Sequence, residues 1–221
     1  MNIKEAMAAR HSVRQYKKQA LTAEAVSALQ AEIEACNKES GLHIQLVTNE
    51  PKAFDGFMAH YGKFSGVKNY IALVGKKGPD LDEKCGYYGE RLVLLAQSLG
   101  VNSCWVAMSY DKSKAGCKLD AGEKLCVVIS LGYGATQGVP HKSKSAEQVM
   151  AAKGEVPQWF RAGVEAALLA PTAMNQQKFK FVLEDGAVAA SAGMGFYSKV
   201  DLGIAKYHFE LGAGRKNFRW K

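Results

Sequence analysis

The chain has 221 residues, of which 48% are apolar, so it can bury a core without disulfides or a structural metal. No apolar run approaches the roughly 18 residues of a membrane span, and no signal-peptide pattern opens the chain, so a cytoplasmic protein without a membrane partner is expected. The formal charge of +8 could attract nucleic acid. However, Lys and Arg are spread along the chain without a nucleic-acid-binding motif, so small phosphorylated ligands are the simpler explanation.

The cysteines are odd in number and form no close CxxC pair, while the histidines show no ligand spacing. We therefore expect reduced, mostly buried thiols and no metal site. The cysteines concerned are Cys36, Cys85, Cys104, Cys117 and Cys126.

The N-terminal half is predicted to alternate helices and short strands. Asn2 and Glu5 have capping-box spacing for a first helix, and Thr22 is a suitable N-cap for a second helix that Gly41 ends. The segments that follow are a strand at 43–47, a helix and loop at 50–66, and an interior strand at 69–74.

The most helical segment carries apolar residues at helical spacing from Tyr88 to Leu99, and Gly100 closes it. Helices and strands are interleaved along the chain, but the strands are too irregularly spaced for repeated βαβ units. The sequence therefore predicts an α+β protein with a mixed sheet. The remaining predicted elements are strands at 103–107 and 124–131, a loop at 132–144, a helix around 160–168, a turn at 170–177, a strand at 178–183 and a helix around 204–211.

The segment Arg10 to Tyr16 reads Arg-His-Ser-Val-Arg-Gln-Tyr, in which two guanidinium groups and the Ser12 hydroxyl could bind a phosphate. The alternative is a solvated basic helix end. The segment resembles the Arg-Arg-Ser-Val-Arg-x-Phe signature of the nitroreductase family of flavoproteins, whose arginines and serine bind the phosphate of FMN. The resemblance implies that Arg10, His11, Ser12 and Arg14 bind the cofactor.

A second resemblance covers residues 86–107, where Leu-Gly-Val-Asn-Ser-Cys-Trp-Val is similar to the family's exit from its long core helix. It implies that Trp105, Val106, Ala107 and Met108 flank the isoalloxazine ring, although the usual glycine after the Trp is missing. A core helix that feeds a buried strand explains the same residues without a flavin.

A third resemblance is the strand that ends in Gly132-Tyr133-Gly134, which is similar to the family's Leu-Gly-Tyr-Pro. Lys142 and Lys144 follow it, where relatives carry basic residues that close on the FMN phosphate. Two lysines in a solvated loop are the alternative reading.

The fourth resemblance is the segment 170–177, Ala-Pro-Thr-Ala-Met-Asn-Gln-Gln, which is similar to the family's Ala-Pro-Ser-Ala-x-Asn-x-Gln turn. Amide side chains there could donate to and accept from the flavin's pyrimidine edge; a plain polar turn is the alternative. The cofactor-binding residues that it implies are Pro171, Thr172, Ala173, Met174, Asn175 and Gln177.

In the family this turn comes soon after the N-terminal motif, but here residues 35–42 hold only a degenerate version. The pattern helix, turn and strand therefore occurs twice, near 24–48 and 158–184. This order resembles a divergent branch of the family with an added C-terminal half-repeat. It implies a three-layer α/β/α sandwich with a mixed, mainly antiparallel sheet, organised as one domain over 1–221, with a core at 1–150 and the half-repeat at 155–221 packed on it.

The resemblance implies an FMN-dependent oxidoreductase that transfers hydride from NAD(P)H to a small flat acceptor, such as a nitroaromatic or a quinone. No catalytic side chain is expected, because the flavin supplies the chemistry. A homodimer is the default, with a monomer as the alternative if the half-repeat replaces a partner. Two rival functions remain open: a flavin-binding protein without reductase turnover, and a basic nucleic-acid-binding module.

Overall fold

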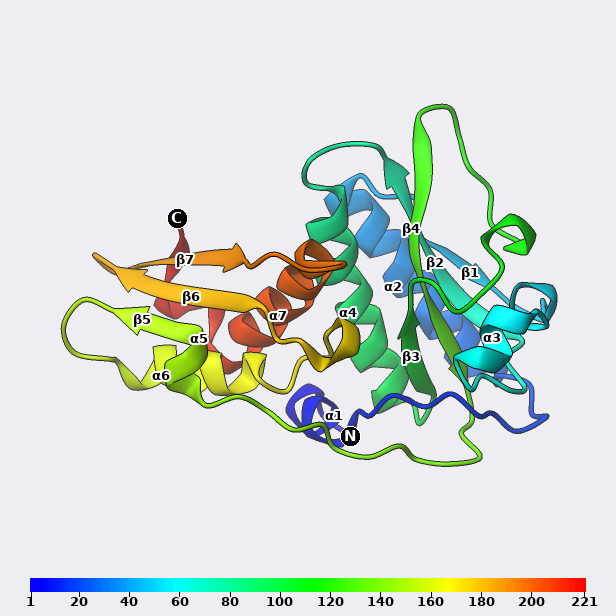
Figure 1. The fold of residues 1–221 in the computed structure, drawn as a ribbon, viewed down its shortest axis with the longest axis horizontal. Helices are drawn as coiled ribbons and strands as arrows, with labels where there is room; N and C mark the ends of the chain where they lie inside the picture. The colour runs from blue at the N-terminus through cyan, green and yellow to red at the C-terminus, as the bar shows by residue number, and fades with distance from the viewer. The chain divides into compact units, whose positions relative to one another are not determined.

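Four antiparallel strands in the order β1-β2-β4-β3 form the first of two sheets (Figure 1). The computed structural model describes all residues from 1 to 221. The first elements are α1 (Ile3–Ala9), α2 (Ala23–Ser40), β1 (Gln45–Val47), the 3₁₀ turn η1 (Lys52–Phe54), α3 (Phe57–Tyr61), β2 (Asn69–Lys76), α4 (Leu81–Ser98), β3 (Asn102–Val106), the 3₁₀ turn η2 (Lys112–Lys114) and β4 (Glu123–Gly132).

The second sheet has the order β5-β6-β7-β8 and is mixed. β6 and β7 form an antiparallel hairpin, whereas β5 pairs parallel with β6 and β8 parallel with β7. The elements of this part are α5 (Ala146–Val149), β5 (Met150–Ala152), α6 (Gln158–Ala167), the 3₁₀ turn η3 (Ala173–Asn175), β6 (Phe179–Glu184), β7 (Ala187–Ala192), α7 (Ser198–Ala213), the 3₁₀ turn η4 (Arg215–Asn217) and β8 (Arg219–Trp220). The predicted α+β fold is confirmed, and the mixed, mainly antiparallel sheet that was predicted corresponds to an antiparallel first sheet and a mixed second sheet.

The chain groups into two units that do not follow a single cut in the sequence. Unit 1 comprises residues 1–81 and 92–140, and unit 2 comprises residues 82–91 and 141–221. Helix α4 therefore contributes its first half to unit 2 and its second half to unit 1. The single-domain organisation stays a prediction, and each unit is described by itself below.

The predicted helix ends are confirmed where side-chain caps define them. The Asn2 side chain accepts from the backbone N–H of Glu5, whose carboxylate in turn accepts from the N–H of Asn2. Thr22 caps α2, and Gly41 ends it in the left-handed region at φ 72°. Helix α4, by contrast, begins at Leu81, seven residues before the predicted apolar stripe starts.

Three strands of the second sheet were not predicted, namely β5, β7 and β8. Strand β7 reads Ala-Val-Ala-Ala-Ser-Ala, a composition with little intrinsic preference for strands. Its pairing with β6 depends on the two-residue turn Asp185-Gly186, in which both residues have positive φ (50° and 73°). An Asp-Gly pair is a strong hairpin signal and could have identified this strand.

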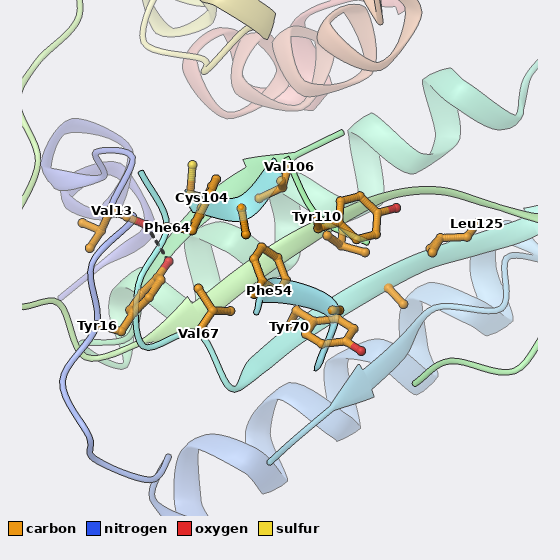
Figure 2. Packing of buried hydrophobic residues seen from close by; sticks show 14 of the residues in the cluster. Val13, Tyr16, Phe54, Phe64, Val67, Tyr70, Cys104, Val106, Tyr110 and Leu125 are labelled. Carbon is orange, nitrogen blue, oxygen red and sulfur yellow. Dashed lines mark hydrogen bonds between the residues drawn. The ribbon is translucent and has the colours of Figure 1, made fainter. Parts of the chain in front are cut away.

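The core of unit 1 joins the N-terminal segment to the first sheet (Figure 2). Val13 and Tyr16 belong to the same buried cluster as residues of β2, β3 and β4. Within it, the ring of Phe54 lies 5.8 Å from that of Tyr70 and 5.9 Å from that of Tyr110, centroid to centroid. This packing fixes the segment after α1 against the sheet.

In unit 2, the first half of α4 approaches α7 through glycines. A Cβ atom at Gly86 would overlap the carbonyl oxygen of Val200, and a Cβ atom at Gly203 would overlap that of Glu83. The backbones of the two helices are therefore in direct contact, which only glycine permits at these positions. Below them, Phe181 and Phe209 stack at 4.6 Å in an aromatic core.

Two further expectations bear on the class of protein. None of the helices combines the length and the apolar composition that crossing a bilayer would require. Four of the five cysteines are buried, Cys117 is half-buried, and none of them forms a disulfide, as the sequence predicts.

Candidate functional site

The predicted phosphate-binding segment is extended and held on both sides within unit 1. After α1 ends, the N–H of Val13 donates to the carbonyl of Ser103 in β3 at 3.0 Å. On the other side, the N–H of Ser65 donates to the carbonyl of Arg14, and the N–H of Tyr16 donates to that of Ser65, both at 3.0 Å. The segment is therefore a fixed part of the sheet region and not a frayed helix end.

Tyr16 anchors the end of this segment. Its hydroxyl donates to the carbonyl of Val13 at 2.6 Å and lies 2.9 Å from the Ser130 hydroxyl. Burial raises the pKa of Tyr16 well above its usual value, so the hydroxyl stays neutral. A Cβ atom at Gly132 would come within 2.7 Å of the Tyr16 ring, so this glycine makes room for the tyrosine.

Three polar side chains of the segment influence the Cys104 thiol of β3. Because side chains alternate along extended backbone, Arg10, Ser12 and Arg14 can share one side. Burial raises the pKa of the Cys104 thiol, while the charge of Arg14, a hydrogen bond from Ser12 and the charge of Arg10 lower it.

Exposure differs among these groups. Arg10 is buried, with 4% of its surface accessible, whereas Arg14 is exposed. The guanidinium carbon of Arg14 lies 5.9 Å from the centre of the Phe64 ring. His11 is half-buried next to Gly138, where a Cβ atom would lie 2.8 Å from that of His11. The arrangement concentrates positive charge and a hydroxyl, which suits a phosphate.

The residues predicted to flank the flavin ring lie at the end of β3 and directly after it, and they differ in burial. Val106 belongs to the buried core (Figure 2). Trp105 and Ala107 are half-buried. The Met108 side chain is 65% exposed. These four residues lie in unit 1 with the phosphate-binding candidates.

In unit 2, the predicted lysine loop and the predicted turn are tied together by hydrogen bonds. The Gln177 amide is buried: its Oε1 accepts from the N–H of Lys144, and its Nε2 donates to the carbonyl of Lys142, both at 2.8 Å. The Lys144 ammonium donates to the carbonyl of Gln177 at 2.9 Å. Lys142 itself is exposed.

Asn175 also bonds within unit 2. Its Nδ2 donates to the carbonyl of Lys142 at 2.9 Å, and its Oδ1 accepts from Gln177 Nε2 at 2.8 Å. Pro171, Thr172 and Ala173 are half-buried, while the Met174 side chain is 93% exposed. The turn thus directs its amide groups toward its own unit and presents Met174. A contact of Asn175 or Gln177 with a flavin stays a prediction.

The structure brings together Arg10, Ser12 and Arg14 in unit 1, and Lys142, Lys144, Asn175 and Gln177 in unit 2. Two polar residues of unit 2 were not predicted: Gln176, which lies in the turn itself, and Asp201, which accepts hydrogen bonds from the turn. Asp201 interrupts the apolar run Val200-Asp201-Leu202 near the start of a helix. This interruption is the signal in the sequence that could have singled it out.

One cluster outside these sets has metal-binding side chains, namely His43, Asp120 and Glu123. His43 Nδ1 lies 2.9 Å from Glu123 Oε2, and the same oxygen accepts from the N–H of Asp120 at 2.8 Å. The hydrogen bond from His43 is the main reason that the pKa of Glu123 is lowered. These bonds account for the cluster as a hydrogen-bonded surface group.

Comparison with known proteins was made by sequence and by structure. A family model described as Putative TM nitroreductase matches residues 2–213. No match is found among curated proteins.

Among solved structures, a protein described as a putative nitroreductase from Thermotoga maritima MSB8 is similar with a TM-score of 0.66 and 24% identity, over 98% of this chain and 85% of that one. A putative nitroreductase from Desulfovibrio desulfuricans, solved in complex with FMN, has a TM-score of 0.52 and 19% identity, over 71% of this chain and 99% of that one. A putative NADH dehydrogenase/NAD(P)H nitroreductase from Parabacteroides distasonis has a TM-score of 0.53 and 21% identity, over 67% of this chain and 97% of that one. At these identities the likeness establishes a shared fold.

Proposed function

Because the chain belongs to the family described as Putative TM nitroreductase, we propose that it is an FMN-dependent oxidoreductase. The observation that carries the proposal is that the segment with Arg10, Ser12 and Arg14 is held against β3 by backbone hydrogen bonds, and that all three side chains act on Cys104 of that strand. Bound FMN would supply the redox chemistry, and the protein would bind and orient it. A relative of the same fold was solved with FMN.

The residues of unit 1 fit the phosphate end of FMN. Two guanidinium groups and a hydroxyl give charge-assisted and neutral donors for a phosphate. The half-buried backbone at Ala107 and the exposed Met108 follow at the end of the same strand that carries Cys104. We infer that this stretch, from Trp105 to Met108, meets the ring system.

For unit 2 we propose that the turn Pro171 to Gln177 and the lysines Lys142 and Lys144 also contribute to cofactor binding. The hydrogen bonds of Asn175 and Gln177 support a shaped turn whose backbone and Met174 are available to a ligand. Asn175→Ala is expected to weaken FMN binding several-fold, because it removes neutral hydrogen bonds worth about 0.5–1.5 kcal/mol each. Unchanged affinity in this variant would make the turn a scaffold only.

The finer assignment is that NAD(P)H is the electron donor and a small flat nitroaromatic or quinone is the acceptor. The name of the Parabacteroides relative supports the donor. We further propose that the enzyme works in the cytoplasm as a homodimer, which size-exclusion chromatography with light scattering would test.

The experiment that tests the function is an absorbance spectrum of the purified protein, recorded before and after anaerobic addition of NADH or NADPH. A flavin spectrum that bleaches with one nicotinamide supports the oxidoreductase. A flavin spectrum that does not bleach would instead support the alternative function, a flavin-binding protein without reductase turnover. A protein that neither carries nor takes up FMN would contradict the proposal, and binding to DNA or RNA would then be measured.

A further inference from the structure

The turn that follows α6 in unit 2 holds an unfavourable backbone conformation. Met174, Asn175 and Gln177 all have positive φ, at 52°, 52° and 46°. Asn tolerates this region, but Met and Gln seldom adopt it. Such strain persists only where surrounding contacts impose it, and it is concentrated at functional sites. The contacts that impose it here can be identified.

The only carboxylate bonded to this turn is that of Asp201, in the first turn of α7. Its Oδ1 accepts from the N–H of Ala173 at 2.9 Å, and its Oδ2 accepts from Gln176 Nε2 at 2.7 Å. The residue is 2% exposed, so water does not replace these bonds. Both oxygens are therefore occupied by neutral donors of the turn.

The two donors of the turn require a hydrogen-bond acceptor at both oxygen positions of residue 201. An asparagine at 201 would present its amide N–H₂ to one of the two donors and lose that bond. Gln176 cannot rotate its amide to compensate, because Nε2 also donates to the carbonyl of Phe196 at 2.8 Å. If the amide rotated, Gln176 Oε1 would face the carbonyl oxygen of Phe196, and both of these atoms are acceptors. The charged form of Asp201 is thus the form that this turn needs.

Charged neighbours do not explain the burial of this carboxylate. The groups that act on its pKa are burial, which raises it, and the hydrogen bonds from Ala173 and Gln176, which lower it. The nearest lysine in sequence to the turn, Lys178, donates its ammonium to the carbonyl of Met194 at 2.7 Å. A buried carboxylate without an ionic partner costs folding free energy, so its presence indicates a role other than stability.

We propose that Asp201 is a positioning residue, which holds the turn from Thr172 to Gln177 in its strained conformation and thereby sets the affinity of that turn for FMN. The proposal rests on the proposed function, because the ligand is FMN. Asp201 itself is buried beneath the turn and acts through Ala173 and Gln176. Without the Asp201 carboxylate, the turn relaxes toward negative φ. The turn then no longer presents Met174 and its neighbours in the same arrangement to a ligand.

The test compares Asp201→Asn with the wild type in the full chain. Hydrogen exchange at the Ala173 amide is expected to become at least roughly tenfold faster, because the bond to Oδ1 or its partner at Gln176 is lost. Affinity for FMN should fall about tenfold, equivalent to the loss of one or two hydrogen bonds, and affinity for riboflavin should fall equally. Equal losses separate this role from one at the phosphate.

Two further variants sharpen the test. Asp185→Asn makes the same chemical change at an exposed hairpin residue and should match the wild type in both measurements. Gln176→Met removes the donor that an asparagine at 201 would oppose. Adding Asp201→Asn to Gln176→Met should therefore cost less affinity than adding it to the wild type.

Unchanged exchange at Ala173 in Asp201→Asn, or faster exchange with unchanged FMN affinity, would overturn the proposal, as would strictly additive effects in the double variant. Failure of the proposed function gives a different result: the wild type would bind no FMN at all. Exchange at Ala173 would then still decide whether Asp201 holds the turn.

Discussion

The guanidinium groups of Arg10 and Arg14 offer the sharpest prediction for single residues. If both groups bind the FMN phosphate as we propose, Arg10→Ala or Arg14→Ala removes charge-assisted hydrogen bonds to it, each worth roughly 1.5–3 kcal/mol. FMN affinity should then fall about tenfold to a hundredfold, while riboflavin affinity changes little. Titration of both ligands against each variant measures this. Arg219→Ala, at an exposed position, is the control, and equal losses for both ligands would indicate a general loss of structure.

Asp201 should also leave a signature in the pH dependence of stability. Burial raises the pKa of its carboxyl from 3.8 to about 6 in the folded protein. The folded state therefore binds this proton more tightly than the unfolded state, so the contribution of Asp201 to the free energy of unfolding is larger below pH 4. That contribution falls by roughly 3 kcal/mol as the pH rises from about 4 to about 6.

The measurement is urea unfolding across pH 4 to 7 for the wild type and Asp201→Asn. Other carboxylates contribute equally to both proteins, so the difference between the two curves isolates Asp201. A difference that does not change with pH would contradict the raised pKa.

The sequence predicted the phosphate candidates and not Asp201, for a physical reason. Arg10, Ser12 and Arg14 lie within five residues of one another, so a short motif and its resemblance to the family signature could single them out together. Asp201 acts on Ala173 and Gln176, more than twenty residues earlier in the chain. An aspartate in the first turn of a helix is also common, because it interacts favourably with the helix dipole.

At the scale of elements, a fully buried pair joins α4 to α7. His208 Nε2 lies 2.9 Å from Glu90 Oε1, and His208 Nδ1 lies 3.1 Å from the carbonyl of Ala166 in α6. A carbonyl only accepts, so Nδ1 carries a proton, and one further proton lies between Nε2 and the carboxyl. The pair thus binds three helices of unit 2 together.

Removing one partner of this pair should be costly. His208→Ala leaves the buried Glu90 without its imidazole and opens a cavity, and we expect a loss of roughly 3–5 kcal/mol in the free energy of unfolding. Glu90→Gln keeps a donor for Nε2 and should lose much less. Urea unfolding of the two variants measures this contrast, and equal losses would mean that the proton between the groups is unimportant.

The sequence predicted elements best where a cap or a sustained period marks them. The caps at Asn2, Thr22 and Gly41 are local, so they could be read directly. The early start of α4 could not be predicted from the local sequence. The first half of this helix packs through Gly86 against α7, so its buried face differs from that of the second half. Strand β7 depends on its partner β6 and not on its own composition.

At the scale of the whole molecule, the predicted boundary near residue 150 differs from the grouping in the structure. Unit 2 begins at residue 141 and includes residues 82–91. Those ten residues belong to an uninterrupted helix, and nothing in their composition separates them from the rest of α4. Their grouping follows from the close approach to α7 at Gly86 and Gly203, which the local sequence does not show.

Turnover by the whole molecule should follow from a single redox centre. No catalytic side chain is expected, and under the proposed function donor and acceptor would use one face of FMN in succession, so each would leave before the other reacts. Initial rates with NADH or NADPH and a quinone should therefore give parallel double-reciprocal lines, typical of a ping-pong mechanism. Asp201→Asn reconstituted at saturating FMN should keep this pattern, because Asp201 sets cofactor affinity. Intersecting lines would require both substrates to be bound together, and the single-centre scheme would then be wrong.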